Sequence, residues 1–367
     1  MPTPLQQLTD HGQSPWIDYV SRQFIRDGEL ADLVERGIVG ITSNPTIFQS
    51  AIADGDAYDD QLREVLQEES DPKEAFLALA QQDIRDACDE LRPVFDRGDA
   101  TRDGWVSLEV DPNFAFDSEA TSKEARRLHG LIDRPNLFVK IPGTEPGLKA
   151  IEDTIAGGIP VNVTLLFSLQ RHREAAEAYL RGLKRLRESG GDLRTVASVA
   201  SFFVSRVDTE ADKRLDKVGG HDELKGKLAI ANAKLAYQTY KELFSGTAWE
   251  ELEREGASPQ RCLWASTSTK NPDYRDVMYV EELIGPKTVN TMPRETVEAF
   301  EDHGHAEDTL ERDVDGARKT LEDLAAAGVD YDDVVEVLER EGVQKFSDSF
   351  RELIDGVAGK RDQLVSA

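Results

Sequence analysis

Short apolar runs alternate with longer amphipathic stretches along the chain, and this alternation limits the fold more than any other feature of the sequence. Apolar strands separated by amphipathic helices are the pattern of βα units, which build parallel sheets. Eight such strands are the number that closes a barrel. The sequence therefore predicts an α/β fold, a (β/α)8 TIM barrel with extra helices. We expect strands near residues 15–19, 38–44, 105–110, 137–142, 160–166, 195–203, 261–266 and 288–292.

The helical stretches exceed what a minimal barrel needs. Residues 49–103 and 205–260 are interpreted as helical insertions, and residues 306–367 as a C-terminal helical extension. Because no Pro/Gly/Ser-rich linker separates these parts, we expect residues 1–367 to form a single domain. Within the extension, a helix over 330–356 has Asp330 as its candidate N-cap. The clearest helices elsewhere are expected at Lys73–Leu91, Leu169–Glu188, Glu223–Phe244 and Ala306–Ala327.

Lys140 is a charged residue inside the apolar run at 137–142. Strand alternation puts Leu137, Val139 and Ile141 on one face, with Phe138 and Lys140 on the other. An ammonium group is costly to remove from water, and loss of its proton relieves that cost. A neutral buried lysine is a nucleophile that forms Schiff bases with carbonyls. The alternative is a structural lysine paired with a buried carboxylate.

Two other expected strands also carry polar residues on one face. Glu109 lies opposite the apolar residues of 105–110, and Asn162 and Thr164 lie opposite those of 160–166. In a barrel, one face of each strand packs on helices, while the inner face presents polar groups near the C-terminal rim. The sequence therefore predicts that these side chains converge with Lys140.

The composition is strongly acidic. Asp and Glu total 71 against 44 Lys and Arg, which gives a formal net charge of −27. Nucleic acid and anionic membranes are therefore poor partners, and a phosphorylated substrate would need local basic residues. Such acidity is typical of a halophile's cytoplasmic protein, where salt screens the self-repulsion. An ordinary acidic enzyme is the alternative.

The cysteine content and the hydropathy favour a cytoplasmic location. Cys88 and Cys262 are the only two cysteines, and they are far apart in the sequence, which favours a reducing compartment. No run of 18 apolar residues is present to span a membrane. Residues 1–10 also lack the basic and apolar regions of a secretory signal.

Four segments, in order, resemble motifs of the transaldolases. They are GITSNPTIF at 40–48, VKIPGTEPGL at 139–148, NVTLLFS at 162–168 and SFFVSR at 201–206. The resemblance runs from about residue 16 to 292. WASTSTK at 264–270 makes the chain most similar to the longer-chain bacterial group. Taken alone, the Thr-Ser-Asn-Pro turn of the first segment is equally consistent with a helix-capping turn.

The resemblance implies a metal-free class I aldol mechanism without a cofactor. Lys140 would form a Schiff base with a ketose phosphate, and Asp18 would take the C4 hydroxyl proton during C3–C4 cleavage. A helix-capping role is the alternative for Asp18. Glu109 and Thr164 match the pair that activates a water molecule. Asn44 and Asn162 match the amides that hold the dihydroxyacetone fragment.

The resemblance also implies a phosphate site, and here the chain departs from the family. Ser201, Arg206 and Ser266 match phosphate-binding positions, with a surface salt bridge as the alternative for Arg206. Many transaldolases carry arginine where this chain has Ser268. Lys270 is expected to supply the missing charge.

The expected activity is transfer of dihydroxyacetone between sedoheptulose 7-phosphate or fructose 6-phosphate and glyceraldehyde 3-phosphate or erythrose 4-phosphate. One alternative is an aldolase that releases free dihydroxyacetone, like the shorter fructose-6-phosphate aldolases of the family. Those tend to have Gln at the position of Glu109 and Tyr at that of Phe203. Another alternative is a catalytically silent sugar-phosphate-binding barrel. A monomer and a homodimer are both compatible with the family.

The remaining conspicuous residues are expected to have ordinary roles. His303 and His305 lie in an acidic stretch, but the sequence offers no third ligand for a metal site. Trp16, Trp105 and Trp264 are expected to pack at the outer shell of the barrel.

Overall fold

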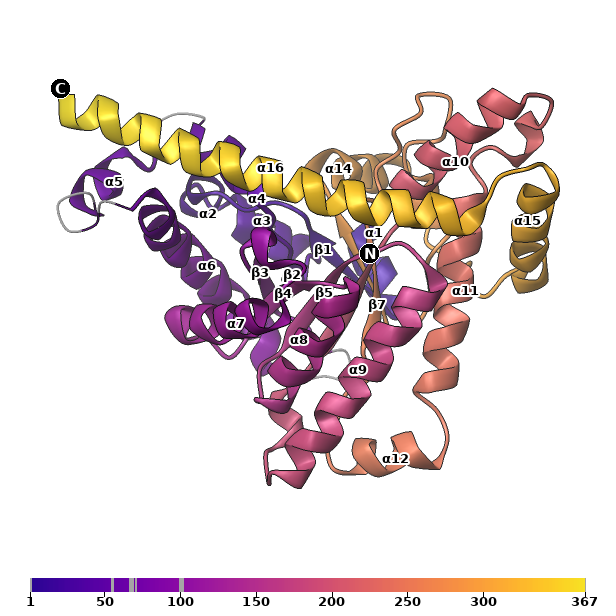
Figure 1. Cartoon of the computed structure of the whole chain (residues 1–367), viewed down its shortest axis with the longest axis horizontal. Coiled ribbons are helices and arrows are strands. Elements are labelled where there is room, and N and C mark those ends of the chain that lie inside the picture. Colours follow the sequence, from indigo (N-terminus) through magenta and orange to yellow (C-terminus); the bar gives the residue numbers. More distant parts are fainter. Residues whose placement is uncertain (1, 54–55, 66–68, 70, 99–101, 367) are drawn as a thin grey trace.

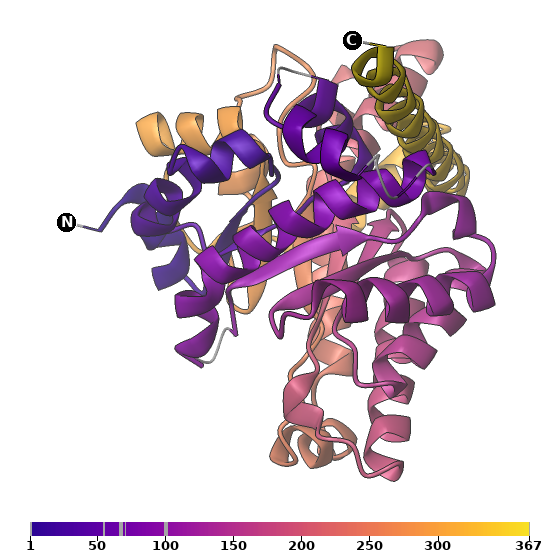
Figure 2. The same ribbon diagram turned by 90° about the vertical axis from the view of Figure 1, so that its left-hand side faces the viewer.

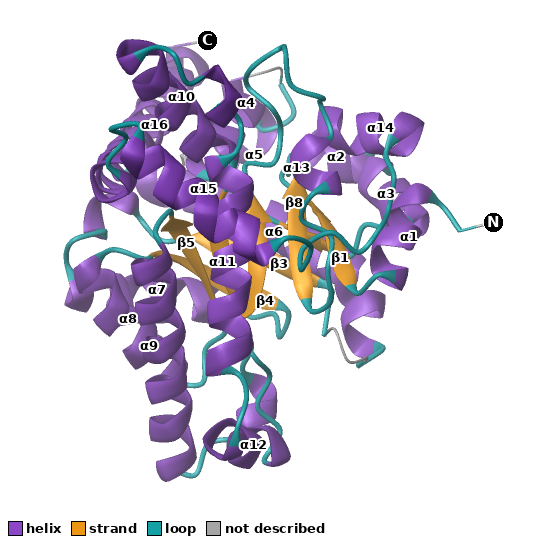
Figure 3. Ribbon diagram, turned by 90° about the vertical axis from the view of Figure 1, so that its right-hand side faces the viewer, coloured by secondary structure: helices purple, strands orange, loops and turns teal. Residues whose placement is uncertain are grey.

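The protein is a closed barrel of parallel strands, which confirms the predicted (β/α)8 fold. The computed structural model describes residues 2–366 apart from 54–55, 66–68, 70 and 99–101. In this part of the chain the strands follow one another in sequence order around the barrel, and the last pairs with the first. Figure 3 shows them enclosed by helices. The strands are β1 (Gln13–Ile17), β2 (Gly40–Ile41), β3 (Trp105–Glu109), β4 (Leu137–Pro142), β5 (Val161–Leu166), β6 (Ser198–Phe203), β7 (Arg261–Ala265) and β8 (Thr288–Met292).

Helices surround the barrel and extend beyond it (Figure 1). No helix in the described ranges is both long and apolar enough to cross a bilayer. The α-helices are α1 (Pro4–Asp10), α2 (Arg22–Arg26), α3 (Glu29–Arg36), α4 (Pro45–Ala53), α5 (Asp59–Val65), α6 (Pro72–Asp96), α7 (Ser118–Ile132), α8 (Glu145–Ala156), α9 (Leu169–Glu188), α10 (Ser205–Val218), α11 (Leu228–Leu243), α12 (Thr247–Arg254), α13 (Met278–Glu281), α14 (Arg294–His303), α15 (Val314–Ala326) and α16 (Tyr331–Ser366). Short 3₁₀ turns occur at η1 (Pro112–Phe114), η2 (Leu193–Thr195) and η3 (Asp222–Leu224).

The last helix, α16, lies across the carboxyl ends of the strands. In Figures 1 and 2 it is the long yellow helix that passes over one end of the barrel. It packs against α4, which follows β2, and against α10, which follows β6. It also packs against α6, which belongs to the insertion before β3. Helix α16 therefore covers the end of the barrel where βα loops assemble active sites.

Three predicted strands differ in their bounds. Strand β1 begins two residues earlier than expected, because polar residues belong to the barrel wall there. The buried Gln13 side chain donates to the Leu283 carbonyl (2.7 Å), and the buried Ser14 hydroxyl donates to Asp103 (2.7 Å). Strand β2 spans only Gly40–Ile41 of the expected 38–44, because the chain turns into α4 at Pro45. The start expected for β6 at residue 195 instead belongs to η2.

Four predicted helices also differ. The helix expected at Lys73–Leu91 is α6, which continues to Asp96 with Pro93 inside it. The helix expected at Glu223–Phe244 is divided by Gly226, whose φ of +69° is incompatible with helix, and α11 begins only at Leu228. The helix expected at Ala306–Ala327 begins at Val314 because the preceding segment makes backbone hydrogen bonds to the Ile284 carbonyl instead. Helix α16 begins as predicted but continues past Gly356, where Leu353 and Val357 are buried.

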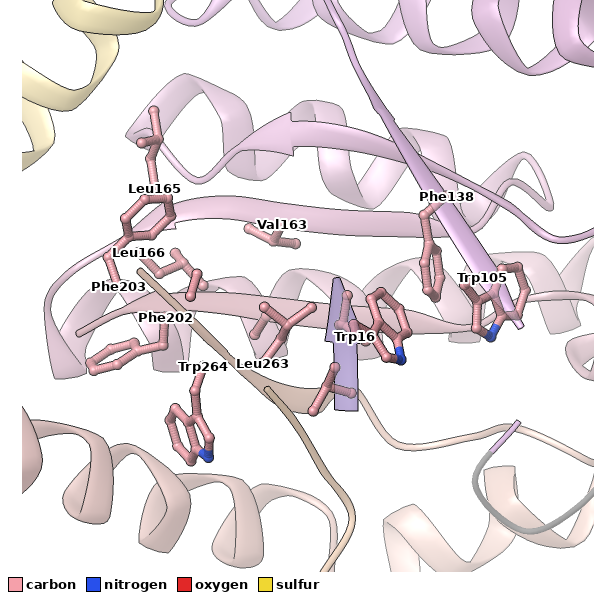
Figure 4. Packing of buried hydrophobic residues seen from close by; sticks show 14 of the residues in the cluster. Trp16, Trp105, Phe138, Val163, Leu165, Leu166, Phe202, Phe203, Leu263 and Trp264 are labelled. Carbon is pink, nitrogen blue, oxygen red and sulfur yellow. The ribbon is translucent and has the colours of Figure 1, made fainter. Parts of the chain in front are cut away.

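Aromatic side chains fill the barrel below the level of Lys140. Phe138 stacks on Trp105 at 4.1 Å between ring centroids and on Trp16 at 6.2 Å (Figure 4). Phe138 shares its strand face with Lys140, so these rings lie inside the barrel. The prediction that Trp16 and Trp105 pack in the outer shell was therefore wrong. Trp264 does lie on the outer face, where it packs edge-on against Phe202.

Gly40 provides a test of this aromatic packing. A Cβ atom at Gly40 would overlap the Trp16 indole, whereas one at Gly356 in α16 would meet no other atom within 4 Å. We expect Gly40→Ala to lower the free energy of unfolding by about 1–3 kcal/mol, as overpacked cores do. The control Gly356→Ala should raise it by about 0.5–1 kcal/mol, because alanine favours helix. Urea unfolding followed by circular dichroism measures both, and equal stabilities for the two variants would contradict the packing described.

Candidate active site

Three polar residues lie side by side on adjacent strands. In the barrel register Glu109 of β3 is paired with Lys140 of β4, which is paired with Asn162 of β5. Because paired residues on neighbouring parallel strands point to the same side, the three side chains share one level of the barrel interior. The structure thus brings together residues that the sequence singled out from three separate segments.

Lys140 is almost fully buried, with a relative exposure of 4%. Its Nζ lies 3.3 Å from Oε2 of Glu109 and donates a hydrogen bond of 3.0 Å to the Ser43 carbonyl. The ring of Phe346, from α16, lies above the amine with its centroid 5.6 Å away. A carboxylate, a carbonyl and an aromatic face therefore hold this amine in place without bulk water.

Burial changes the acidity of Glu109. Removal from water raises its pKa to about 7, although the charge of Lys140 acts in the opposite direction. Neither Glu109 carboxyl oxygen has a well-directed hydrogen bond from the described part of the protein, and the same holds for the Thr164 hydroxyl. These buried oxygens have unused hydrogen-bonding capacity. Glu109 can therefore exchange a proton near neutral pH.

Asp18 directly follows β1 and lines the same cavity as Lys140. Burial raises the pKa of Asp18, while the nearby charge of Lys140 and a hydrogen bond from Thr42 partly oppose this shift. The Thr42 hydroxyl lies 2.6 Å from Asp18 Oδ1 and 2.7 Å from the Thr291 hydroxyl. The helix-capping alternative is not observed, because Ser21 caps α2.

The two amides are held by different partners. Asn162 is fully buried, donating to the Ser107 hydroxyl (3.0 Å) and accepting from the Ser201 hydroxyl (2.7 Å). The Asn44 side-chain oxygen accepts from the Ile47 amide (3.1 Å), so Asn44 does stabilise the start of α4, as the alternative reading held. Asn44 also lines the cavity, where its side-chain nitrogen remains a donor.

These groups surround one cavity of about 350 Å³ at the carboxyl end of the barrel. This volume is within the range of small-ligand sites. All the predicted site residues border it except Glu109 and Asn162, which lie below it and contact Lys140 and Ser201. Its lining is Asp18, Thr42, Asn44, Thr46, Ile47, Lys140, Thr164, Ser201, Phe203, Arg206, Ala265, Ser266, Ser268, Lys270, Thr291, Pro293, Glu295, Lys345 and Phe346.

The residues predicted to bind phosphate meet on one side of this cavity. The Arg206 guanidinium lies over the Phe203 ring, 5.0 Å from its centroid. The Ser266 hydroxyl lies 3.0 Å from that of Ser205, and Lys270 donates to the Ser268 hydroxyl (2.7 Å). Ser201 lies deeper, hydrogen-bonded to Asn162. The salt-bridge alternative for Arg206 is not seen, because it forms no ion pair with a described carboxylate.

Comparisons with known proteins agree with this site. The family model for transaldolase/fructose-6-phosphate aldolase matches residues 15–357. The chain is 52% identical to a transaldolase of Thermobifida fusca, over 98% of each chain. It is 53% identical to a transaldolase of Parafrankia sp., over the full length of both. A protein of Streptomyces coelicolor named transaldolase 2 is 48% identical over 100% of this chain and 99% of its own.

The chain belongs to the transaldolase/fructose-6-phosphate aldolase family. It is an enzyme of the transaldolase type, as predicted. The relatives match over nearly their whole length, so the family assignment covers the α16 segment as well as the barrel.

Several residues of this family member's site were not foreseen from the sequence. Lys345 and Phe346 reach the cavity from α16, a helix that the sequence predicted but whose side chains were not assigned to the site. Thr42 is hydrogen-bonded to Asp18 and Ser107 to Asn162, while Thr291 is hydrogen-bonded to Thr42. Strand alternation predicts that Ser107 shares the inward face of Glu109, although no site role was assigned to Ser107 from the sequence.

The two histidines near the end of α14 are engaged by acidic neighbours. His303 contacts Asp276 (2.9 Å) and Asp302 (3.1 Å). Across the described ranges, no group of three or more His, Cys, Asp or Glu side chains is arranged to hold a metal ion.

The raised pKa of Glu109 predicts a pH dependence of turnover. If the ionised carboxylate is the base, activity should rise as the pH rises through about 7, where Glu109 loses its proton. Glu109→Gln should slow turnover by about 10²–10⁴-fold and remove this inflection. The exposed Glu145, in the first turn of α8, provides the control variant Glu145→Gln. Steady-state rates across the pH range test both, and an inflection that persists in Glu109→Gln would exclude Glu109 as its source.

Proposed function

We propose that this transaldolase-family enzyme transfers a dihydroxyacetone unit between sugar phosphates through a Schiff base on Lys140. The donor would be sedoheptulose 7-phosphate or fructose 6-phosphate, and the acceptor glyceraldehyde 3-phosphate or erythrose 4-phosphate. The observation that carries the proposal is the position of one buried amine, 3.3 Å from a carboxyl group of raised pKa and bordering a cavity that also contains Asp18.

The first steps require an amine, a proton shuttle and a water molecule. The unprotonated Lys140 nitrogen attacks C2 of the ketose and forms a carbinolamine. Loss of its hydroxyl as water leaves a protonated imine. Glu109 is suited to move protons in this step, because it adjoins the amine and its pKa is about 7. The unpartnered Thr164 hydroxyl is suited to orient the water.

Cleavage uses the imine as an electron sink. Asp18 takes the proton of the C4 hydroxyl, the C3–C4 bond breaks, and its electron pair moves toward the iminium nitrogen to give an enamine. An aldehyde leaves, and the acceptor aldehyde then reacts by the reverse steps. The raised pKa of Asp18 makes it a stronger base than a solvated aspartate.

A transferase must retain the enamine until the acceptor arrives. We expect Asn44 and Asn162 to hold the hydroxyls of the three-carbon fragment. Asn44 borders the cavity directly, whereas Asn162 lies below it and donates to the Ser107 hydroxyl. Phe346 covers Lys140 from α16 and limits the access of water. Glu109 and Phe203 also favour a transferase over an aldolase that releases free dihydroxyacetone, since the short aldolases tend to have Gln and Tyr at these positions.

We further propose a cytoplasmic enzyme with sugar phosphates, rather than nucleic acid or membranes, as its partners. The net charge of −27 supports this choice of partners, and the two free, buried cysteines are compatible with a reducing compartment. A single domain over residues 1–367 accords with the packing of α16 on helices from both insertions. A monomer and a homodimer both remain compatible with the proposal.

Borohydride trapping tests the Schiff base. With fructose 6-phosphate present, reduction should leave one dihydroxyacetone adduct on Lys140, detected by peptide mass spectrometry. Lys140→Ala should show no adduct and no transfer, because no other lysine borders this cavity as deeply. The exposed Lys149, paired with Asp153 on α8, provides the control Lys149→Ala, which should still be labelled. An adduct on a different lysine of the native enzyme would refute the assignment.

An acceptor-dependence assay separates transfer from simple cleavage. Glyceraldehyde 3-phosphate formation from fructose 6-phosphate should require erythrose 4-phosphate, because the enamine stays on Lys140 until an aldehyde binds. Without acceptor, the native enzyme should release at most one equivalent per site. Continuous release of free dihydroxyacetone at a comparable rate would establish the aldolase alternative. Absence of both reactions and of any adduct would favour the catalytically silent barrel.

A further inference from the structure

Three cationic side chains border one side of the cavity, and they come from three separate parts of the fold. Arg206 lies at the start of α10, Lys270 lies in the loop after β7, and Lys345 lies near the middle of α16. Within the described structure, none of the three forms an ion pair with a carboxylate. Most other lysine and arginine side chains of this acidic protein have such a partner close by.

This arrangement is electrostatically unfavourable without a bound anion. Like charges that approach each other raise the free energy of the folded protein, and low dielectric around Arg206 strengthens the effect. The repulsion from Arg206 is the largest cause of the lowered pKa of Lys345, followed by burial and by Lys270. Asp18 and Glu295 also border the cavity, but neither forms an ion pair with Lys345.

The position of Lys345 also follows from the packing of α16. Its neighbour Phe346 is buried with 4% exposure and covers Lys140, which fixes this turn of the helix over the cavity. Lys345, the residue before it, is exposed and also lines the cavity, on the side of the other two cations. Ser268 lies on that side too, and its hydroxyl adds no charge.

We propose that Lys345 is a third cation of the phosphate site, so that the phosphate of the bound sugar joins α16 to the rim of the barrel. This inference rests on the proposed sugar-phosphate substrates and adds a residue to their recognition. It adds a positive charge from α16 to the charge that Lys270 is expected to supply in place of the arginine absent at Ser268. A phosphate dianion would contact Arg206, Ser266 and Lys345 at once and neutralise the repulsion among the cations.

Inorganic phosphate serves as the probe, at an ionic strength held constant with potassium chloride. Phosphate should raise the melting temperature of the native enzyme and inhibit it competitively against fructose 6-phosphate. In Lys345→Met, we expect the inhibition constant for phosphate and the KM for fructose 6-phosphate to rise about tenfold, the effect of losing one charge-assisted hydrogen bond. The thermal stabilisation by phosphate should fall accordingly, while kcat changes less than KM.

Two control variants separate phosphate binding from helix stability. Arg351→Met removes an exposed cation of α16 that pairs with Asp348, and it should leave the response to phosphate unchanged. Lys345→Arg keeps the charge and should keep most of that response. A purely structural role for Lys345 would lower the melting temperature of Lys345→Met but preserve its shift with phosphate, and this result would overturn the proposal.

Failure of the proposed role of Lys345 can be distinguished from failure of the proposed function. If the native enzyme forms the Lys140 adduct but Lys345→Met retains its phosphate inhibition constant and KM within twofold, only the role of Lys345 is wrong. If no adduct forms while phosphate still stabilises the protein through Lys345, the anion site is supported and the reaction assignment fails.

Discussion

The pairing of one amine with one carboxyl group inside the barrel is the interaction on which the rest of this structure depends. Each charged group loses several kcal/mol of hydration when it is buried, and only a close partner offsets that loss. Lys140 and Glu109 meet because their strands are neighbours in register, 3.3 Å apart at the side chains. The aromatic layer of Trp16, Trp105 and Phe138 seals the barrel beneath them, and α16 covers them from above. The barrel wall therefore serves mainly to keep this pair together and away from water.

Much of this arrangement could be predicted from the sequence because strand alternation is a local property. The inward direction of Glu109, Lys140, Asn162 and Thr164 follows from their positions between apolar residues, and the structure places all four at one end of the barrel. Strand alternation did not predict the start of β1, where polar residues form part of the barrel wall. Gln13 and Ser14 read as a loop in sequence, yet their hydrogen bonds to Leu283 and Asp103 make them part of β1.

Local sequence patterns do not predict contacts between segments that are distant in the chain. The amphipathic character of helix α16 predicts that it packs against another element, but not that Lys345 and Phe346 face a cavity formed by residues between Asp18 and Glu295. The same limit explains why the positions of Trp16 and Trp105 were predicted wrongly. A large apolar ring is equally suited to the outer shell and to the interior of a barrel. Likewise, Gly226 and the segment before Val314 interrupt helical patterns through a backbone angle and a tertiary hydrogen bond that periodicity does not encode.

Helix α16 follows all eight strands in the chain, and this order has a consequence for biosynthesis. A ribosome makes all eight strands before it makes Tyr331, so the barrel can close around Lys140 while the site is still uncovered. During that interval the Lys140 amine and Glu109 are accessible to water and small metabolites. The nucleophile is therefore shielded only after the segment that carries Phe346 has been made and has packed over Lys140.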